Sequence, residues 1–114
     1  MNDKLLEAVK QTYADSWMEW PEGSKQRRLM WKADELVSRD EAIEMFKAAG
    51  VLSYNAFTPE LLEKLPADVT IRIAREYSVC VYVYGQTLTQ STADEMLVDE
   101  FDRQGDGGYR LWWD

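Results

Sequence analysis

The stretch that decides the fold is VTIRIAREYSVCVYVY, residues 69–84. In its first half, Val69, Ile71 and Ile73 alternate with polar or small residues, which is the pattern of a half-buried strand. Residues 77–84 carry β-branched and aromatic side chains on both faces, which is typical of a central strand. The stretch therefore predicts two strands of a small sheet.

The residues before this stretch show helical periodicity. Residues 3–20 repeat large apolar side chains every three or four positions, and Pro21 ends the pattern. Residues 24–37 predict a second helix, with Ser24 as its N-cap. At about 100° per residue, Trp31 falls on the polar face of that helix, together with Arg27 and Arg28.

Two shorter helices follow with clear boundaries. Residues 38–50 begin with the capping pair Ser38 and Glu41 and end at Gly50. Thr58 and the proline after it begin another helix, which Pro66 ends.

Three elements are expected after the two strands. Gly85 and Gln86 predict a turn into a short strand at 87–89. Ser91 to about Gln104 predicts a last helix, and YRLWW at 109–113 a last strand. The expectation is a single α+β domain, residues 1–114: N-terminal helices packed on a small, mostly antiparallel sheet, with one further helix before a C-terminal strand.

Charge and composition limit the classes of partner. The 114 residues have a net charge of −8, which disfavours direct binding to nucleic acid or to anionic membranes. It permits binding to a basic protein surface. No apolar run approaches the roughly 20 residues of a membrane span, and the N-terminus lacks a signal-peptide pattern. A soluble, cytoplasmic protein is expected.

The inventory of reactive side chains is poor. The chain has no histidine and one cysteine, so the usual zinc and iron ligand sets and the Ser-His or Cys-His pairs cannot be assembled from it. Cys80 lies in the middle of a predicted strand and reads as a buried thiol. No catalytic residue, metal or cofactor is assigned. A hydrolase that uses carboxylates and tyrosine stays open, and it requires a deep pocket with two carboxylates of raised pKa.

The stretch FDRQGDGGYRLWW, residues 101–113, resembles the start of a calcium loop but does not complete one. Counting from Asp102 puts Gln104, Asp106 and Gly107 at loop positions three, five and six. Position twelve, where the bidentate glutamate belongs, is Trp113. The glycines predict instead a turn from the last helix into the last strand.

Acidic side chains gather on the predicted last helix. Glu95, Asp99 and Asp102 are four and three residues apart, so a helix would align them in a stripe that Asp106 extends. Nothing at matching spacing neutralises them. Such a row can imitate a phosphate backbone for a protein that binds nucleic acid, or it can be a solvated helix face.

Two aromatic regions are further candidates for a partner surface. Trp31 with Arg27 and Arg28 fits an interface anchor, an internal cation–π contact or simple core. In the last strand, Trp112 points away from Trp113, so both faces carry bulk. Burial on both sides is favoured for this strand, and an edge that docks a partner or a second copy is the alternative.

The sequence thus predicts a non-enzymatic, acidic protein-binding inhibitor. The expected target is a nucleic-acid-binding protein or complex, blocked by charge mimicry in the manner of anti-CRISPR or anti-restriction proteins of phages and mobile elements. The partner residues expected are Glu95, Asp99, Asp102, Asp106, Arg27, Arg28, Trp31 and Trp112. The alternatives are an immunity or antitoxin protein that neutralises a basic toxin, and a structural or adaptor domain that forms a homodimer.

Overall fold

The stretch 69–84 forms a long antiparallel pair at the centre of the molecule. In this computed structural model, which describes residues 2–14, 18–19, 25–26 and 29–114, β5 spans Thr70–Glu76 and β6 spans Ser78–Tyr84. They pair over their whole length, from Thr70 opposite Tyr84 to Glu76 opposite Ser78. Both predicted strands are confirmed. Only Tyr77 lies between them, with a left-handed φ of 63°.

Four more strands complete an antiparallel sheet around this pair. They are β3 (Met30–Lys32), β4 (Val37–Ser38), β7 (Glu100–Arg103) and β8 (Tyr109–Trp112). The order is β3-β5-β6-β8-β7, and β4 also pairs with β5. The last strand, β8, is therefore an inner strand, and β7 forms one edge. A separate pair joins β1 (Met18–Glu19) to β2 (Lys25–Gln26).

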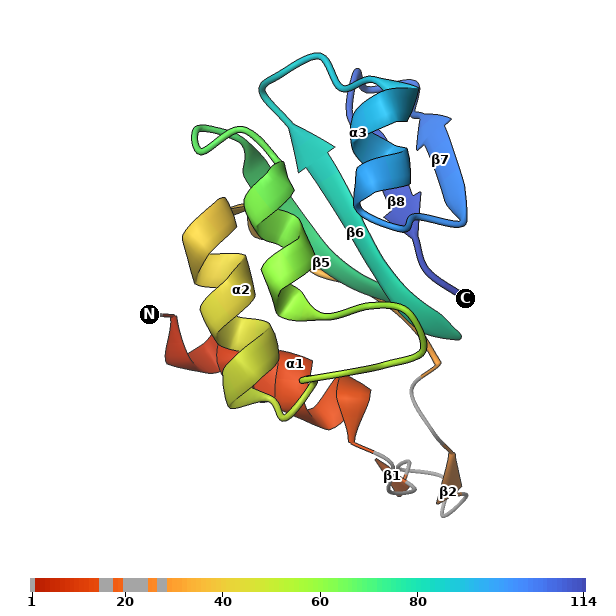
Figure 1. Ribbon diagram of the computed structural model, residues 1–114. Coiled ribbons are helices and arrows are strands. Elements are labelled where there is room, and N and C mark those ends of the chain that lie inside the picture. The colour runs from red at the N-terminus through yellow and green to blue at the C-terminus, as the bar shows by residue number, and fades with distance from the viewer. Residues whose placement is uncertain (1, 15–17, 20–24, 27–28) are drawn as a thin grey trace.

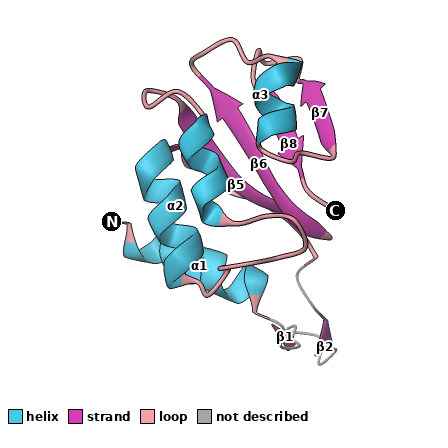
Figure 2. Cartoon of the chain, in the orientation of Figure 1, coloured by secondary structure: helices cyan, strands magenta, loops and turns pink. Residues whose placement is uncertain are grey.

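The helices all begin at polar caps. They are α1 (Asp3–Tyr13), α2 (Arg39–Ala48), the 3-10 helix η1 (Pro59–Lys64) and α3 (Gln90–Glu95). Ser38 accepts the backbone N–H of Glu41 at 3.1 Å, as its capping position predicts. Figure 1 shows α2, η1 and α3 on one side of the sheet, with α1 below them. Figure 2 shows the same division into a helical layer and a strand layer. The predicted α+β fold is confirmed.

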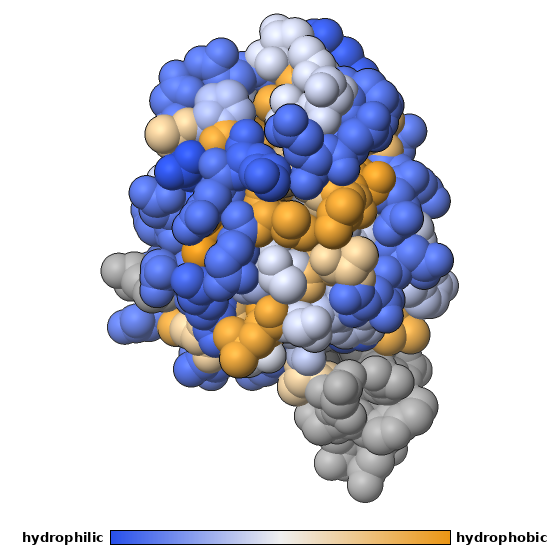
Figure 3. All heavy atoms as spheres, in the orientation of Figure 1, coloured by the Kyte–Doolittle hydropathy of each residue, from blue (hydrophilic) through white to orange (hydrophobic). Residues whose placement is uncertain are grey.

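The core lies between these helices and one face of the sheet. An aromatic row runs through it: the ring centroids of Phe46 and Phe57 are 5.0 Å apart, and those of Phe57 and Trp113 are 4.8 Å apart. All three side chains are fully buried. The strands contribute their inward-facing residues, namely Ile71, Ile73, Val79, Val81, Val83, Tyr109 and Leu111. Seen from the helical side, hydrophilic residues surround a band of hydrophobic residues (Figure 3).

The N-terminal helix predictions are wrong in part. The helix predicted at 3–20 ends at Tyr13, and Ala14 is already extended. Of the helix predicted at 24–37, the described residues 25–26, 30–32 and 37 lie in strands. Pairing with β5 overrides the local helical pattern, since Trp31 lies opposite Arg75 and Val37 opposite Ile71. Arg27 and Arg28 lie outside the described residues.

The helix predicted at 91–104 is also wrong after its first turns. Thr89, not Ser91, caps α3, and the helix ends at Glu95. Leu97 takes a φ of 59°, which reverses the chain, and Glu100–Arg103 then pairs with β8. The strand predicted at 87–89 is absent too; those residues form an irregular connection between β6 and α3. Within the described ranges, every helix falls short of the length and apolarity that crossing a bilayer requires.

Candidate functional site

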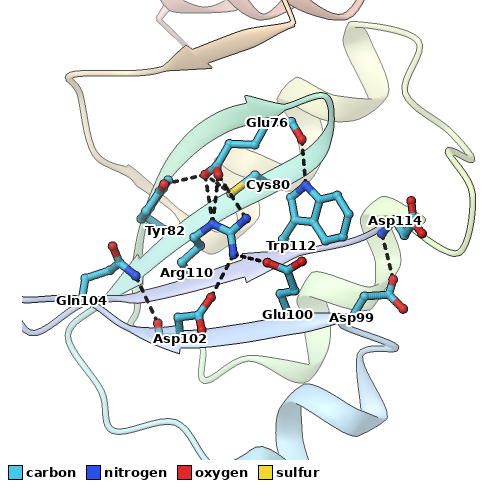
Figure 4. Close-up of polar contacts among 10 residues, drawn as sticks. All are labelled: Glu76, Cys80, Tyr82, Asp99, Glu100, Asp102, Gln104, Arg110, Trp112 and Asp114. Carbon is cyan, nitrogen blue, oxygen red and sulfur yellow. Dashed lines mark hydrogen bonds and ion pairs between the residues drawn. The ribbon is translucent and has the colours of Figure 1, made fainter.

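The face of the sheet opposite the helices carries a polar cluster. Because side chains alternate along a strand, the residues between the core positions point to this second face, here named the open face. No described helix covers it. Its central residues are Glu76, Cys80, Tyr82, Arg110 and Trp112, and Glu100 and Asp102 of β7 share it. Figure 4 shows these side chains gathered over the strands.

Glu76 is the hub of the cluster. Arg110 donates from Nε at 3.1 Å to both of its oxygens, and its Nη2 forms an ion pair with Oε1 at 3.0 Å. The Tyr82 hydroxyl donates to Oε2 at 2.6 Å, and the Cys80 thiol at 3.2 Å. Partial burial opposes ionisation, but these hydrogen bonds outweigh it and lower the pKa of Glu76 below its ordinary value of 4.5. Glu76 is therefore held as a carboxylate.

Arg110 connects this hub to the edge of the sheet. Its Nη1 donates to Glu100 at 3.0 Å and to Asp102 at 2.9 Å. One guanidinium thus serves three carboxylates, counting Glu76, and the group keeps two net negative charges. The cluster is also tied to the backbone, because the Trp112 indole donates to the Glu76 carbonyl at 2.8 Å.

The same contacts fix the protonation of the neighbouring groups. Burial and the hydrogen bond to Glu76 raise the pKa of the Tyr82 hydroxyl and of the Cys80 thiol well above their ordinary values. Both groups stay protonated at neutral pH. Glu76 stays ionised, and both of its carboxylate oxygens accept hydrogen bonds. The cluster therefore presents a carboxylate that is held in place by its hydrogen-bond donors.

The predicted acidic stripe does not exist as a helix face. Glu95 ends α3, Asp99 lies in the turn after it, and Asp102 lies in β7. Asp99 accepts the backbone N–H of Asp114 at 2.8 Å, and Asp102 is paired with Arg110. The prediction that nothing neutralises these groups is therefore wrong for Asp102. Glu95 is exposed.

Asp106 shapes the turn between β7 and β8. It accepts the backbone N–H of Gly108 at 3.0 Å and the hydroxyl of Tyr84 at 2.9 Å. The Gly108 and Tyr84 hydrogen bonds, in that order of strength, lower the pKa of Asp106. Gly107 takes a φ of 87°, as the glycine-rich turn predicts. The described residues contain no group of three metal-ligating side chains.

The two tryptophans of the predicted surface have different places. Trp31 is half-buried against the core from β3, so its predicted position on a polar helix face is wrong. Trp112 is half-buried on the open face, where its indole is fixed. The last strand has β6 on one side and β7 on the other, so the alternative of an edge strand is wrong. Burial on both faces holds only in part, because Tyr109 and Leu111 are buried in the core whereas Arg110 and Trp112 are half-buried on the open face.

The sequence reasoning missed Glu76, Tyr82 and Arg110. The one sequence pattern that could have revealed them is alternation, because they occupy every second position of strands whose other positions are apolar. Placing them together requires the register of β8 against β6, where Arg110 lies opposite Tyr82. That register joins distant parts of the chain and has no local signature.

Negative charge is concentrated in the last part of the chain. Residues 91–114 contain seven acidic and two basic side chains, a net charge of −5 out of −8 for the whole chain. The acidic side chains lie on α3, on β7, in the turns that follow these two elements and after β8: Asp94, Glu95, Asp99, Glu100, Asp102, Asp106 and Asp114. We call these seven residues the acidic end. Of the two basic residues, Arg110 is already shared by three carboxylates.

Comparisons with protein-family models, with curated proteins and with solved structures found no match for this chain.

Proposed function

We propose that this protein is a non-enzymatic inhibitor that binds a basic surface of a nucleic-acid-binding protein through its acidic end. The observation that carries the proposal is the net charge of −5 over residues 91–114, held on an ordered sheet edge and a capped helix. A positively charged groove that normally holds phosphates attracts such a surface, because complementary potentials speed the encounter and fix its orientation.

The order of the acidic end supports this reading over a merely solvating role. Asp102 and Glu100 are held by Arg110, Asp99 by a backbone N–H and Asp106 by two hydrogen bonds. A carboxylate that is already fixed loses little conformational freedom when a partner binds it. Fixed carboxylates can match the spacing of a partner's lysines and arginines at little entropic cost, whereas mobile carboxylates must first lose conformational freedom.

The test is charge reversal at the two acidic residues whose change disturbs the sheet least. Asp94 and Glu95 are exposed in the last turn of α3, and Asp94 receives one side-chain hydrogen bond, from Gln90. The double variant D94K/E95K should lose the proteins captured by immobilised wild type from an extract of its host. Those proteins should also be released by duplex DNA and by raised salt.

The matched control reverses two exposed acidic residues far from the acidic end, Glu44 on α2 and Glu63 on η1. E44K/E63K changes the net charge by the same amount and should retain the captured proteins. Equal loss in both double variants would mean that only net charge matters. Full retention by D94K/E95K would contradict the proposal.

A further inference from the structure

The edge strand β7 has backbone groups with no partner among the described residues. The Gln104 N–H donates to the Gly108 carbonyl at 2.8 Å. In an antiparallel pair every second residue is bonded inward, so Asp102 and Glu100 also face β8. The N–H and C=O groups of Phe101 and Arg103 therefore point outward. Figure 1 shows no described strand or helix beyond β7 on that side.

The two faces beside this edge differ in charge. On the open face next to β7, the carboxylates of Glu100, Asp102 and Glu76 share the single guanidinium of Arg110. The other cations of that face, Lys32 of β3 and Arg72 of β5, lie over the rings of Tyr82 and Tyr84. On the core face, Phe101 stacks on Tyr109, with ring centroids 5.3 Å apart, and Arg103 lies 5.4 Å from the Tyr109 ring. A strand added at this edge thus meets carboxylates on one face, and an aromatic pair with one cation on the other.

We propose that β7 receives an extended segment of the partner as an additional strand, with basic side chains at alternate positions and small uncharged ones between them. This inference rests on the proposed function and names its recognition mode. Backbone hydrogen bonds to Phe101 and Arg103 align the added strand, and its basic side chains neutralise Glu100 and Asp102. Arg103 excludes cations from the core-facing positions.

Charge argues against a second copy of this chain as the occupant. Two β7 strands paired edge to edge would bring Glu100 and Asp102 of one copy beside those of the other on the same face. Like charges opposite each other destabilise a strand pair. Acidic edge residues are a common means by which proteins prevent such self-pairing.

The test uses a short peptide in which arginine and threonine alternate, and a second peptide of the same sequence with N-methylated threonines. N-methylation removes backbone donors and keeps every charge. Titration followed by the amide NMR signals of the protein should show binding of the first peptide with shifts at Phe101 and Arg103. The methylated peptide should bind about tenfold more weakly, which corresponds to the loss of one or two backbone hydrogen bonds.

A protein variant gives an independent check. Proline is tolerated at an edge position whose N–H points outward, so R103P should fold and weaken binding of the first peptide by a similar factor. R103A removes the same positive charge, keeps the N–H and should bind as well as wild type or better. Urea unfolding before the titration shows whether R103P has lost stability. If it has, the comparison of the two peptides alone tests the strand addition.

Each other outcome overturns the strand addition. Equal binding of the two peptides would mean that attraction by the acidic end is their only contact with the protein. The proposed function would then stand without the strand addition. Binding of neither peptide would remove this edge as a site, whereas the capture experiment with D94K/E95K would still decide the proposed function. If the wild-type protein dimerises and the R103P variant does not, the edge belongs to a second copy of the chain.

Discussion

The two faces of the central sheet are built from alternate residues of the same strands and are stabilised in different ways. Leu111 of β8 and Trp113, directly after the strand, enter the core under the helices. Arg110 and Trp112 of the same strand lie on the open face. Yet Cys80, on the open face, is as fully buried as the core residues. Tyr82 and Trp112 pack beside it, and its thiol donates to Glu76 at 3.2 Å. Aromatic rings and an ion-paired carboxylate thus cover this part of the open face, as the helices cover the other face.

The largest effect should come from breaking the helix-covered face. Trp113→Ala removes a fully buried indole that packs on Phe57 and donates to the Met96 carbonyl at 2.8 Å. We expect it to lower the free energy of unfolding by about 3–5 kcal/mol, measured by urea denaturation. Trp112→Ala, the same truncation on the open face, should cost less than half as much. Equal costs would mean that the two faces are packed alike.

Breaking the ion network should give the second largest effect. Arg110→Met leaves Glu76, Glu100 and Asp102 without their shared cation, and we expect a loss of about 2–3 kcal/mol in the free energy of unfolding. In the double variant E76Q/R110M the two single losses should not add, because each removes the same interaction. Additive losses in urea unfolding would show that Glu76 and Arg110 act independently.

The contribution of the open face to the free energy of unfolding should depend on pH, because it includes the ionised side chain of Glu76. The pKa of Glu76 is depressed in the folded state, so its contribution is complete above 4.5 and is lost as the pH falls through the lower folded-state value. The difference in unfolding free energy between wild type and Glu76→Gln should therefore be constant near neutral pH and shrink as the pH falls below 4.5. A difference that grows on acidification would contradict the depressed pKa.

The smallest effect should come from the hairpin that joins β5 to β6. Tyr77 is 65% exposed and holds a left-handed backbone, which costs a non-glycine residue about 1 kcal/mol. Its backbone is clamped by a hydrogen bond to Leu29 and one from Arg75. Tyr77→Gly should raise the melting temperature slightly, and Tyr77→Val should lower it. Thermal unfolding of the two variants checks the sign, and a lower melting temperature for glycine would contradict it.

The sequence patterns predicted the elements whose signals are local. Alternation over 69–84 predicts β5 and β6, and the capping pair of Ser38 and Glu41 predicts α2. The patterns failed where pairing decides: residues 30–32 look helical but bind along β5, and residues 100–103 look helical but bind along β8. The acidic residues of the site were found by composition. Their true arrangement was not, because the left-handed Leu97 ends the helix without a glycine to mark it.

The strand order also has a consequence for how the chain assembles. β5 and β6 are joined by one residue and pair over their full length, so they can meet early, and β7 and β8 are likewise close in sequence. β3 reaches its place beside β5 only after the whole segment that holds α2 and η1 has formed a closed loop. Closing a long loop costs entropy before any contact compensates for it. We therefore expect the β5–β6 pair to template the sheet, and the β3 edge to join last in folding and to separate first in unfolding.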